Sequence, residues 1–330
     1  MPPHSVDIFG EILLDMLPDV PGRLRDVRQF AKTLGGAPAN VAVGLARLGR
    51  SVRILSKLSD DEFGAFLAQQ LRLEGVDTSA TSIAPGTKTP IVFVGLQENG
   101  ERSFAFFCEK PADEAIEADD WNTLELAPIL HLGSNLMPHA VGLDATLRLM
   151  RRAREERRLV AFDMNLRLNL WPSIGHARET IVQALRYCDL LKLSEDEASF
   201  LLGRERFEPR ELQELLSPLG VRWLVLTYGP GGSRLLGPSL DLRAAGEQIC
   251  AVDTTGAGDA FWAGLLYGVE ASLSTRDGDP CDWPLRLSED DWRRSLALAN
   301  HLGARVCTER GATTALPHQQ EVPWTRLGWA

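Results

Sequence analysis

The stretch Ala251-Val252-Asp253-Thr254-Thr255-Gly256-Ala257-Gly258-Asp259-Ala260-Phe261 precedes an apolar segment of helical period that continues through Leu266. Thr254 or Thr255 can cap such a helix, and the small residues at 256–258 leave their backbone N–H groups open to a ligand. The first turn of a helix also carries unpaired donors and the positive end of the macrodipole. We therefore predict that the start of this helix binds an anion.

Asp259 lies one turn into the same predicted helix, within reach of a group that the helix start holds. We expect the N–H groups of Gly256, Ala257 and Gly258 to stabilise charge on a transferring phosphoryl group. Asp259 would accept the proton of an attacking hydroxyl, and the helix dipole predicts a lowered pKa for it. A weak base suffices, because the transition state of phosphoryl transfer needs mainly the orientation of the reacting groups and a late removal of the proton. The alternative for the stretch is an ordinary glycine-rich helix entry.

The rest of the chain alternates between short apolar runs and segments of helical period. This alternation is typical of an α/β fold with a doubly wound, mainly parallel sheet flanked by helices. The chain has 330 residues, 44% of them hydrophobic, and we predict a single domain over residues 1–330. The runs predicted as strands of the main sheet are 6–9, 52–58, 129–132, 159–162, 190–193 and 223–227.

Two segments interrupt this alternation, at about residues 12–34 and 89–108. In the second, the runs TPIVFVGL and RSFAFF flank Asn99-Gly100, which is a strong hairpin signal because both positions tolerate positive φ. We predict that the two segments form a small β-sheet lid that projects from the main sheet. An edge hairpin of the main sheet is the alternative. The polar stretch 272–290 is predicted to be a surface loop.

The charge balance limits the kinds of partner that the protein can bind, and the cysteines indicate its compartment. Lysine and arginine number 35 against 45 aspartate and glutamate, and the net charge of -10 disfavours nucleic acid and anionic membrane surfaces. The sequence has no charge-free run of 18 apolar residues that would predict a membrane span. Asp7, Glu11 and Asp15 interrupt the N-terminal apolar run, which does not resemble a signal peptide. Five scattered cysteines fit reduced thiols, and we expect a cytoplasmic protein.

Two separate motifs resemble the signatures of the ribokinase-type sugar kinases, the PfkB family. Residues 253–261, DTTGAGDAF, are similar to the C-terminal signature of that family, and residues 35–49, GGAPANVAVGLARLG, are similar to its N-terminal signature. The resemblance extends from about Asp7 to Pro317. It implies a ribokinase-like fold with a β lid and transfer of the γ-phosphoryl group of ATP to a sugar hydroxyl. Asp259 would be the catalytic base, and residues 256–258 the anion hole.

The resemblance also implies a set of sugar-binding residues. The carboxylate of Asp15 can accept two sugar hydroxyls, and Asn40 offers both a donor and an acceptor. Residues 162–167, FDMNLR, resemble the FDPNLR segment of fructokinases, with Met164 in place of proline. The alternatives for Asp15, Asn40 and Arg167 are a turn residue, a helix cap and a structural ion pair. The full set is Asp15, Gly35, Gly36, Asn40, Arg102, Phe104, Asn165 and Arg167.

On the nucleotide side, Lys192-Leu193-Ser194-Glu195 occupies the place of the NxxE motif of the family, with lysine in place of asparagine. Glu195 is expected to help hold hydrated Mg²⁺, which keeps several waters and prefers carboxylate and phosphate oxygens. Lys192 is the candidate for a phosphate contact. The backbone carbonyl groups of Asp253 and Thr255 are candidate ligands of a monovalent cation such as K⁺. The remaining nucleotide-binding candidates are Thr227, Gly229, Gly232 and Asn300.

The lid sequence bears on the identity of the sugar. Residues 100–104 and 110–113 resemble the lid segment of bacterial fructokinases, and Glu109 would disfavour an anionic substrate if it faced the pocket. We therefore expect ATP-dependent phosphorylation of fructose to fructose 6-phosphate. A 2-keto-3-deoxygluconate kinase is the main alternative, because Arg102 and Arg167 could receive a carboxylate, and another PfkB-type sugar kinase also stays open. From a different class, a non-catalytic sugar sensor could keep the same fold.

The phenylalanines of the lid hairpin predict a homodimer. Phe104 and Phe106 stand at strand spacing, and an exposed β edge rich in phenylalanine is a liability unless it is paired or covered. We expect a second copy of the chain to cover it. The other expected partners are ATP and a small-molecule sugar.

Overall fold

The computed structural model describes residues 4–20, 22–96, 102–117, 119–272 and 278–329, without the side chains of residues 96 and 102–104. Its main sheet contains nine described strands, and the neighbouring strands from β5 to β11 pair in parallel. The last two strands add an antiparallel edge. The order across the sheet is β13 (Asp241–Ala244), β12 (Ser233–Leu236), β11 (Trp223–Thr227), β10 (Leu190–Ser194), β9 (Leu159–Asp163), β8 (Ile129–Gly133), β1 (Val6–Phe9), β4 (Val52–Ser59) and β5 (Thr81–Ala84).

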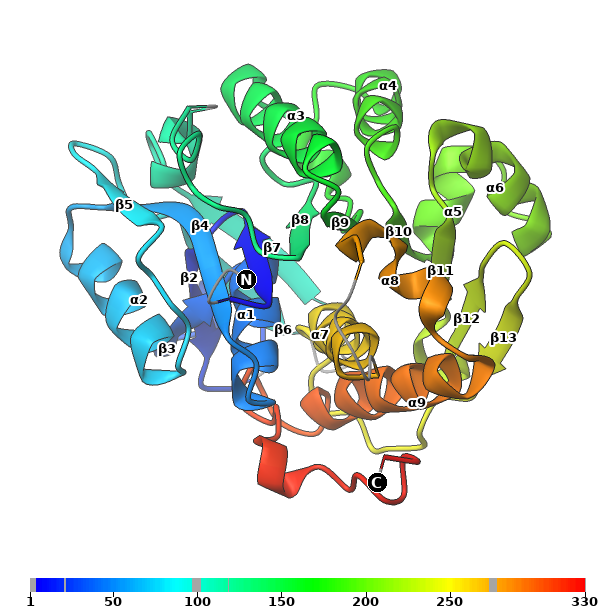
Figure 1. Cartoon of the computed structure of the whole chain (residues 1–330). Helices are drawn as coiled ribbons and strands as arrows, with labels where there is room; N and C mark the ends of the chain where they lie inside the picture. The colour runs from blue at the N-terminus through cyan, green and yellow to red at the C-terminus, as the bar shows by residue number, and fades with distance from the viewer. Residues whose placement is uncertain (1–3, 21, 97–101, 118, 273–277, 330) are drawn as a thin grey trace.

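Helices cover both faces of this sheet, as Figure 1 shows. Each face of the sheet has its own hydrophobic core, because side chains alternate along a strand. Val6 and Ile8 of β1 belong to the first core, and Phe9 belongs to the second. None of the described helices is both long and apolar enough to cross a membrane. The predicted doubly wound α/β fold is confirmed. The first core packs against α1 (Ala37–Arg47), α2 (Glu62–Leu73), α7 (Ala257–Ala271) and α9 (Glu289–Val306), and the second against α3 (Ala140–Glu155), α4 (Ile174–Leu185), α5 (Glu195–Leu202) and α6 (Pro209–Leu216).

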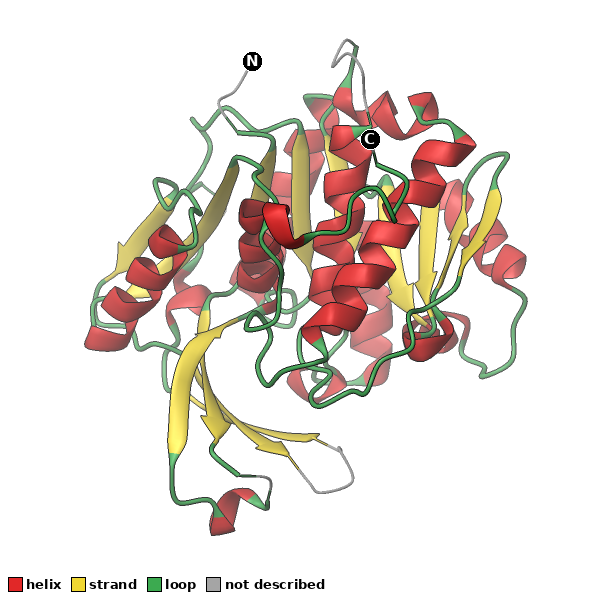
Figure 2. Ribbon diagram, turned by 90° about the horizontal axis from the view of Figure 1, so that it is seen from below, coloured by secondary structure: helices red, strands yellow, loops and turns green. Residues whose placement is uncertain are grey.

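A second sheet of four described strands lies apart from the main sheet, in the order β3 (Phe30–Gly35), β2 (Leu13–Pro18), β6 (Ile91–Leu96) and β7 (Arg102–Phe107). Figure 2 shows it projecting from the body of the molecule. Strands β6 and β7 pair antiparallel, with Ile91 opposite Phe107. The predicted turn at Asn99-Gly100 lies outside the described residues. The predicted lid is confirmed, and an edge hairpin of the main sheet is excluded, because these strands form a sheet of their own.

The predicted surface loop at 272–290 is wrong for the part that the structure describes. A short 3₁₀ turn, Pro280–Asp282, leads into α8 (Trp283–Arg286), and both Cys281 and Trp283 are buried. The carboxylate of Asp282 accepts hydrogen bonds from Arg157 and Arg222 at 2.8 and 2.9 Å. Burial of the tryptophan therefore anchors a segment whose composition is mainly polar.

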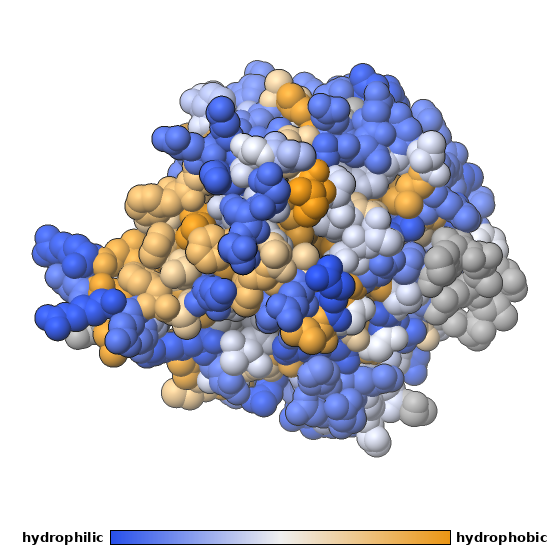
Figure 3. Space-filling view, turned by 90° about the vertical axis from the view of Figure 1, so that its left-hand side faces the viewer, coloured by the Kyte–Doolittle hydropathy of each residue, from blue (hydrophilic) through white to orange (hydrophobic). Residues whose placement is uncertain are grey.

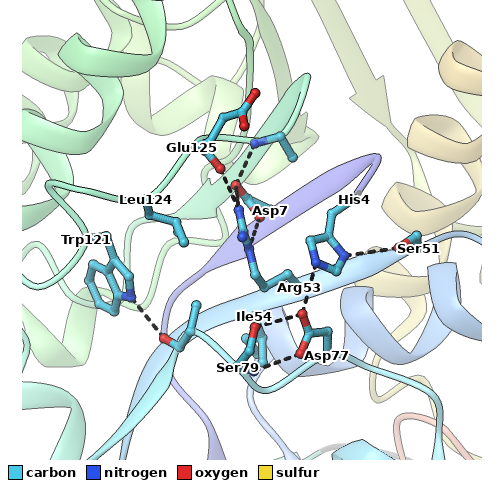
Figure 4. A network of polar contacts seen from close by, with 12 residues as sticks. His4, Asp7, Ser51, Arg53, Ile54, Asp77, Ser79, Trp121, Leu124 and Glu125 are labelled. Atoms are coloured by element: carbon cyan, nitrogen blue, oxygen red, sulfur yellow. Dashed lines mark hydrogen bonds and ion pairs between the residues drawn. The ribbon is translucent and has the colours of Figure 1, made fainter. Parts of the chain in front are cut away.

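A buried ion pair joins the central strands near the start of β1 (Figure 4). Arg53 on β4 donates to both carboxylate oxygens of Asp7 on β1, each at 2.9 Å. Arg53 also donates to the carbonyl oxygen of Glu125, and the N–H of Ala127 donates to Asp7, at 2.8 and 2.7 Å. The network thus ties β1 and β4 to the segment that enters β8. It therefore helps to fix β1 and β8, whose carboxyl ends lead into residues of the candidate site.

Candidate active site

Helix α7 starts at the glycine-rich stretch. Gly256 is the N-cap, with φ 76°, and a Cβ there would lie 2.6 Å from the carbonyl oxygen of Ala312, so both the conformation and the space require glycine. The N-cap position thus holds a glycine and not a threonine, and the N–H and Oγ1 of Thr255 donate to Asp253 at 3.0 and 2.7 Å. The predicted threonine cap is therefore wrong. Residues 256–258 line a cavity, as an anion-binding helix start requires.

Asp259 lies in the first turn of α7 and is buried. Its Oδ2 accepts a hydrogen bond of 2.8 Å from Nδ2 of Asn40 on α1. Burial raises the pKa of Asp259 to about 6; the Asn40 hydrogen bond and the charge of Lys192 oppose the rise, and the charge of Asp163 adds to it. The lowered pKa expected from the helix dipole is wrong, because desolvation outweighs the dipole. A carboxylate with this pKa is mainly ionised at neutral pH and basic enough to take up a proton.

Asp259 borders a cavity of about 210 Å³ that lies between the main sheet and the lid. The lid contributes Val92 and Phe106 to the lining, and the turn before α7 contributes residues 254–256. The lining therefore comes from the lid, from α1 and the start of α7, and from loops that follow strands of the main sheet. Of the predicted sugar-binding residues, it includes Asp15, Gly36, Asn40, Asn165 and Arg167.

The other predicted sugar-binding residues differ in what the structure describes. A Cβ at Gly35 would lie 2.4 Å from Oδ2 of Asp15, so glycine leaves room for that carboxylate beside the cavity. Arg102 and Phe104 belong to β7, but their side chains are outside the described part of the chain. Phe106, two residues further along the same strand, is the described phenylalanine that lines the cavity.

The cavity also contains polar residues that the sequence analysis missed, Glu11 and Asn135. Nδ2 of Asn135 donates to Oε1 of Glu11 at 2.8 Å. Burial raises the pKa of Glu11 to about 7, although the hydrogen bond from Asn135 opposes the rise. Burial also raises the pKa of Asp15 to about 7, and the charges of Asp259 and Asp253 add to it. One signal could have found Glu11: it follows the first strand, and ligands bind beyond the carboxyl ends of strands in open α/β sheets.

Lys192 brings a fixed positive charge to the start of α7. Its Nζ lies 2.8 Å from each carboxylate oxygen of Asp163, and a Cβ at Gly258 would lie 3.1 Å from the same Nζ. Burial alone would lower the pKa of Lys192, but the charges of Asp163 and Glu197 outweigh it and raise the pKa. The ammonium group is therefore charged and adjacent to the predicted anion hole.

Two glutamates that follow Lys192, Glu195 and Glu197, lie in different surroundings. Glu195 is exposed at the start of α5 and lines a separate cavity beside β12 and β13, so the structure does not bring it to the first turn of α7. Glu197 is buried, and its two oxygens accept the N–H groups of Leu166 and Ser194, each at 2.7 Å. Burial raises the pKa of Glu197 against the attraction of Lys192. The sequence analysis missed Glu197, the α5 acid that interacts with this lysine.

A second cavity, of about 440 Å³, also adjoins the start of α7. Its walls come from the turn after β11, from residues 246–249 and 251, and from α7 and α9. Ile249 and Phe261 give it an apolar surface that suits a flat base. Nδ2 of Asn300 donates to the carbonyl oxygens of Ala244 and Ala245 at 3.3 and 3.2 Å. Asn300 therefore braces one wall of the cavity. The predicted nucleotide-binding residues in this lining are Thr227, Gly229, Gly232 and Asn300.

The two cavities meet at α7. Thr254, Ala257 and Gly258 line both of them. A group held by the first turn of α7 would therefore lie between a ligand in the first cavity and a ligand in the second. With a buried carboxylate on one side and the Lys192 ammonium beside Gly258, this arrangement can transfer an anionic group from one ligand to the other.

Comparison with known proteins assigns the chain to a family. Residues 3–319 match the model of the pfkB family carbohydrate kinases. The chain belongs to the PfkB family. It is therefore a phosphotransferase that acts on a sugar hydroxyl, as the two signature motifs predicted.

Relatives of this PfkB kinase include named fructokinases. The chain is 40% identical over 321 residues to the probable fructokinase-7 of Arabidopsis thaliana, covering 95% of this chain and 90% of that protein. The fructokinase of Xylella fastidiosa with bound ATP is 31% identical, with a TM-score of 0.86 over 98% of this chain and 97% of that chain. A double mutant of the Vibrio cholerae O395 fructokinase, in fructose, ADP and potassium ion bound form, is 31% identical, with a TM-score of 0.83 over 96% of each chain.

Proposed function

We propose that this PfkB kinase is an ATP-dependent fructokinase that converts fructose to fructose 6-phosphate. The observation that carries the proposal is the meeting of two cavities at the first turn of α7, next to Asp259. The relatives support the substrate, because the Arabidopsis and Xylella proteins are named as fructokinases and the Vibrio structure holds fructose and ADP. The lid and the body that carries α7 both line the cavity of about 210 Å³, which we call the sugar cavity, so we infer that residues 1–330 act as one kinase domain that includes the lid.

Asp259 is the proposed general base. The hydroxyl oxygen of the bound sugar attacks the γ-phosphorus of ATP while its proton passes to the Asp259 carboxylate. The bond from the γ-phosphorus to the bridging oxygen breaks, and ADP leaves with that electron pair. Asn40 already holds Oδ2 of Asp259, and we assign Oδ1 to the sugar hydroxyl.

The first turn of α7 is the proposed anion hole. The N–H groups of Gly256, Ala257 and Gly258 would receive the oxygens of the transferring phosphoryl group at the positive end of the helix dipole. Lys192 adds a charge next to Gly258, and Asp163 holds its ammonium group in place. These donors are fixed before the reaction, so they stabilise developing charge without reorganising.

We propose Mg²⁺ as the metal that accompanies ATP. Mg²⁺ usually uses one or two carboxylates together with phosphate oxygens and water, so it needs no cage of protein ligands. Glu197 fits this role better than Glu195, because Glu197 interacts with Lys192 at the anion hole and Glu195 lines another cavity. When bound, the metal supplies charge that neutralises the phosphates.

The turn before α7 is the proposed site of a monovalent cation. Gly311 and Thr255 both donate backbone N–H groups to the carboxylate of Asp253, at 2.9 and 3.0 Å, so this turn is held in one conformation. Carbonyl oxygens are suitable ligands for a hard cation such as K⁺. We assign the carbonyl groups of Asp253 and Thr255 to this role, and the potassium ion of the Vibrio structure supports the assignment.

The acidity of the sugar cavity favours a neutral sugar over 2-keto-3-deoxygluconate. Glu11, Asp15 and Asp259 line the cavity as buried carboxyl groups, and Arg167 is the only cation among the described residues of the lining. The carboxylate of an anionic sugar would meet like charges here. The hydroxyls of fructose can instead donate hydrogen bonds to these groups. Glu109, on which the expectation rested, is exposed and is not among the described lining residues.

We infer a homodimer that forms through the lid. The ring of Phe93 makes edge-to-face contacts with the rings of Phe30 and Phe107, with centroids 5.0 and 5.4 Å away. Phe107 is 61% exposed. Figure 3, which views the side of the molecule that carries α2 and the lid, shows a broad apolar patch. A second copy of the chain would cover this patch. Sedimentation should show a dimer that Phe107→Ser weakens, and a monomeric wild-type protein would contradict the inference.

We also infer a cytoplasmic location. All five cysteines fall within the described residues and are free thiols. Reduced cysteines are typical of that compartment, whereas secreted proteins usually pair theirs. Fractionation of cells that express the full-length chain tests this directly.

A coupled assay of ADP release tests the proposed activity. Purified protein is supplied with ATP and Mg²⁺ and with fructose, 2-keto-3-deoxygluconate or ribose in turn. We expect the highest kcat/KM with fructose. A higher value with 2-keto-3-deoxygluconate would replace the substrate assignment. Sugar binding without ADP release from any sugar would favour a sugar sensor.

A further inference from the structure

The chain continues past residue 319, where the family match ends, and its last described residues fold back onto the kinase body. Val322 and Leu327 are buried in the core that includes α7 and α9. Trp324 and Trp329 pack against Tyr267 of α7, with ring centroids 5.2 and 5.8 Å away. Figure 1 shows this part of the chain, in red, next to α9. We call residues 320–329 the C-terminal segment.

One arginine of the C-terminal segment reaches the wall of the second cavity, of about 440 Å³, which we call the nucleotide cavity. Nη2 of Arg326 lies 3.0 Å from Oε1 of Glu247 and 3.1 Å from Nδ1 of His301 on α9. Nδ1 of His301 lies 3.0 Å from the same carboxylate. Glu247 lines the nucleotide cavity, as does Asn300, the residue before His301. Three side chains from separate parts of the chain therefore meet at this wall.

Glu247 lies in a part of the wall that has no regular secondary structure. Residues 245–250 form neither helix nor strand, and most of them line the cavity. The amide of Asn300 holds the carbonyl groups at the start of this segment, and the N–H of Val252 donates to the carbonyl oxygen of Cys307 at 2.8 Å at its end. Loops of this kind open at a low free-energy cost. The Glu247 contact therefore holds the middle of the wall between two fixed ends.

We propose that the C-terminal segment is a latch that positions the wall of the nucleotide cavity, with Arg326 as a positioning residue. The proposal rests on the proposed function, in that the second cavity takes ATP. Arg326 is not among the described residues that line either cavity, so it acts through Glu247. A wall that is ordered before ATP arrives loses less conformational entropy on binding. The latch therefore raises the affinity for ATP and leaves the sugar cavity unchanged.

If the C-terminal segment only stabilised the fold, changes in it would alter the unfolding temperature and not the affinity for ATP. The buried Val322 and Leu327 and the two tryptophans attach the C-terminal segment to the core, and their loss would lower the unfolding temperature. Arg326 is largely exposed and contributes little to that attachment. A substitution of Arg326 therefore tests the effect on the cavity wall without disturbing the packing of the C-terminal segment on the core.

Arg326→Gln is the decisive variant. We expect the KM for ATP to rise about three- to fivefold, the effect of one exposed ion pair, while kcat, the KM for fructose and the unfolding temperature change little. Arg326→Lys should restore most of the affinity for ATP. Arg293→Gln is the matched control, because Arg293 is also an exposed arginine paired with a glutamate, Glu289 on α9. An unchanged KM for ATP in Arg326→Gln would overturn the latch.

Hydrogen exchange of the nucleotide-free protein provides a readout that does not depend on activity. Residues 245–252 should exchange faster in Arg326→Gln than in the wild type or in Arg293→Gln. In a Glu247→Gln background, Arg326→Gln should add nothing to the exchange rate or to the KM for ATP. Unchanged exchange, or additive effects of the two substitutions, would overturn the latch. A wild-type protein without kinase activity would overturn the proposed function, whereas faster exchange in Arg326→Gln would still support the latch.

Discussion

Nδ2 of Asn40 donates a hydrogen bond of 2.8 Å to Oδ2 of Asp259, across 219 residues of sequence. The contact joins the two signature motifs, because Asn40 lies on α1 and Asp259 lies in the first turn of α7. The helices approach closely: a Cβ at Gly44 of α1 would lie 2.8 Å from Cβ of Ala263 on α7. Small residues at this crossing therefore set the distance between the amide and the proposed base.

Asp259→Asn removes the proton acceptor and keeps the shape of the side chain. We expect kcat to fall by at least about 100-fold, the usual contribution of a general base. ATP should still bind, because the anion hole and Lys192 remain. Steady-state kinetics and calorimetric titration with fructose and ADP would measure both effects. Asp290→Asn, at an exposed position on α9, is the control. Near-normal turnover in Asp259→Asn would remove Asp259 from the catalytic role.

Activity at low substrate concentrations reports the free enzyme, and its pH dependence should follow the ionisation of Asp259, whose pKa burial raises to about 6. The base acts only when it is ionised, so this activity should rise with pH through about 6. Asn40 opposes the raised pKa through its hydrogen bond, so Asn40→Ala should move the acidic limb of the profile to higher pH. The measurement is the reaction rate against pH at fructose and ATP concentrations well below their KM values. An acidic limb that stays in place in Asn40→Ala would contradict this assignment.

Asp15→Asn should stabilise the empty protein at high pH while it weakens sugar binding. Burial raises the pKa of Asp15 from 3.8 to about 7, so between these values the folded state keeps a proton that the unfolded state loses. Stability therefore falls as pH rises through this range. At pH 8 the variant should gain up to about 4 kcal/mol in the free energy of unfolding, and near pH 4 it should gain less than about 1 kcal/mol.

Urea denaturation of the wild type and of Asp15→Asn at the two pH values measures this difference. Asp290→Asn again serves as the control, because its carboxylate is exposed. A gain in stability that is equal at both pH values would show that packing, not ionisation, causes it. A Kd for fructose that does not change would exclude Asp15 from sugar binding.

The start of α7 could be predicted from the sequence because its chemistry is local. Glycine, a helix start and an acid within one turn place Gly256 and Asp259 together whatever surrounds them. Six strands of the main sheet and the lid hairpin could also be predicted, since apolar runs and an Asn-Gly turn are short-range signals. The edge strands β5, β12 and β13 were missed. The contact of Asn40 with Asp259 needed the family resemblance, because no local pattern relates residues on α1 and α7.

The parts of the site that were missed depend on packing between distant elements. Glu11 and Asn135 meet only because β1 and β8 are neighbours in the sheet. The pKa of Asp259 was predicted in the wrong direction, because its burial depends on helices and strands far away in sequence. The choice between Glu195 and Glu197 required the direction of each side chain on α5, which the spacing of a motif does not supply.

Glu197→Gln and Glu195→Gln form a matched pair that tests the metal assignment. Both remove one carboxylate from the start of α5, but only Glu197 interacts with Lys192. We expect Glu197→Gln to raise the Mg²⁺ concentration needed for half-maximal activity by about tenfold or more. Glu195→Gln should change it little, because that side chain is exposed and lines another cavity.

Glu197 also has a structural role that the experiment must separate from metal binding. Its oxygens accept the N–H groups of Leu166 and Ser194, and a glutamine has one acceptor oxygen for the two donors. The loop that carries Arg167 could therefore shift and raise the KM for fructose. Titration of Mg²⁺ at saturating fructose isolates the metal effect, since the sugar cavity is then filled. A larger Mg²⁺ effect in Glu195→Gln than in Glu197→Gln would assign the metal to the exposed acid of α5.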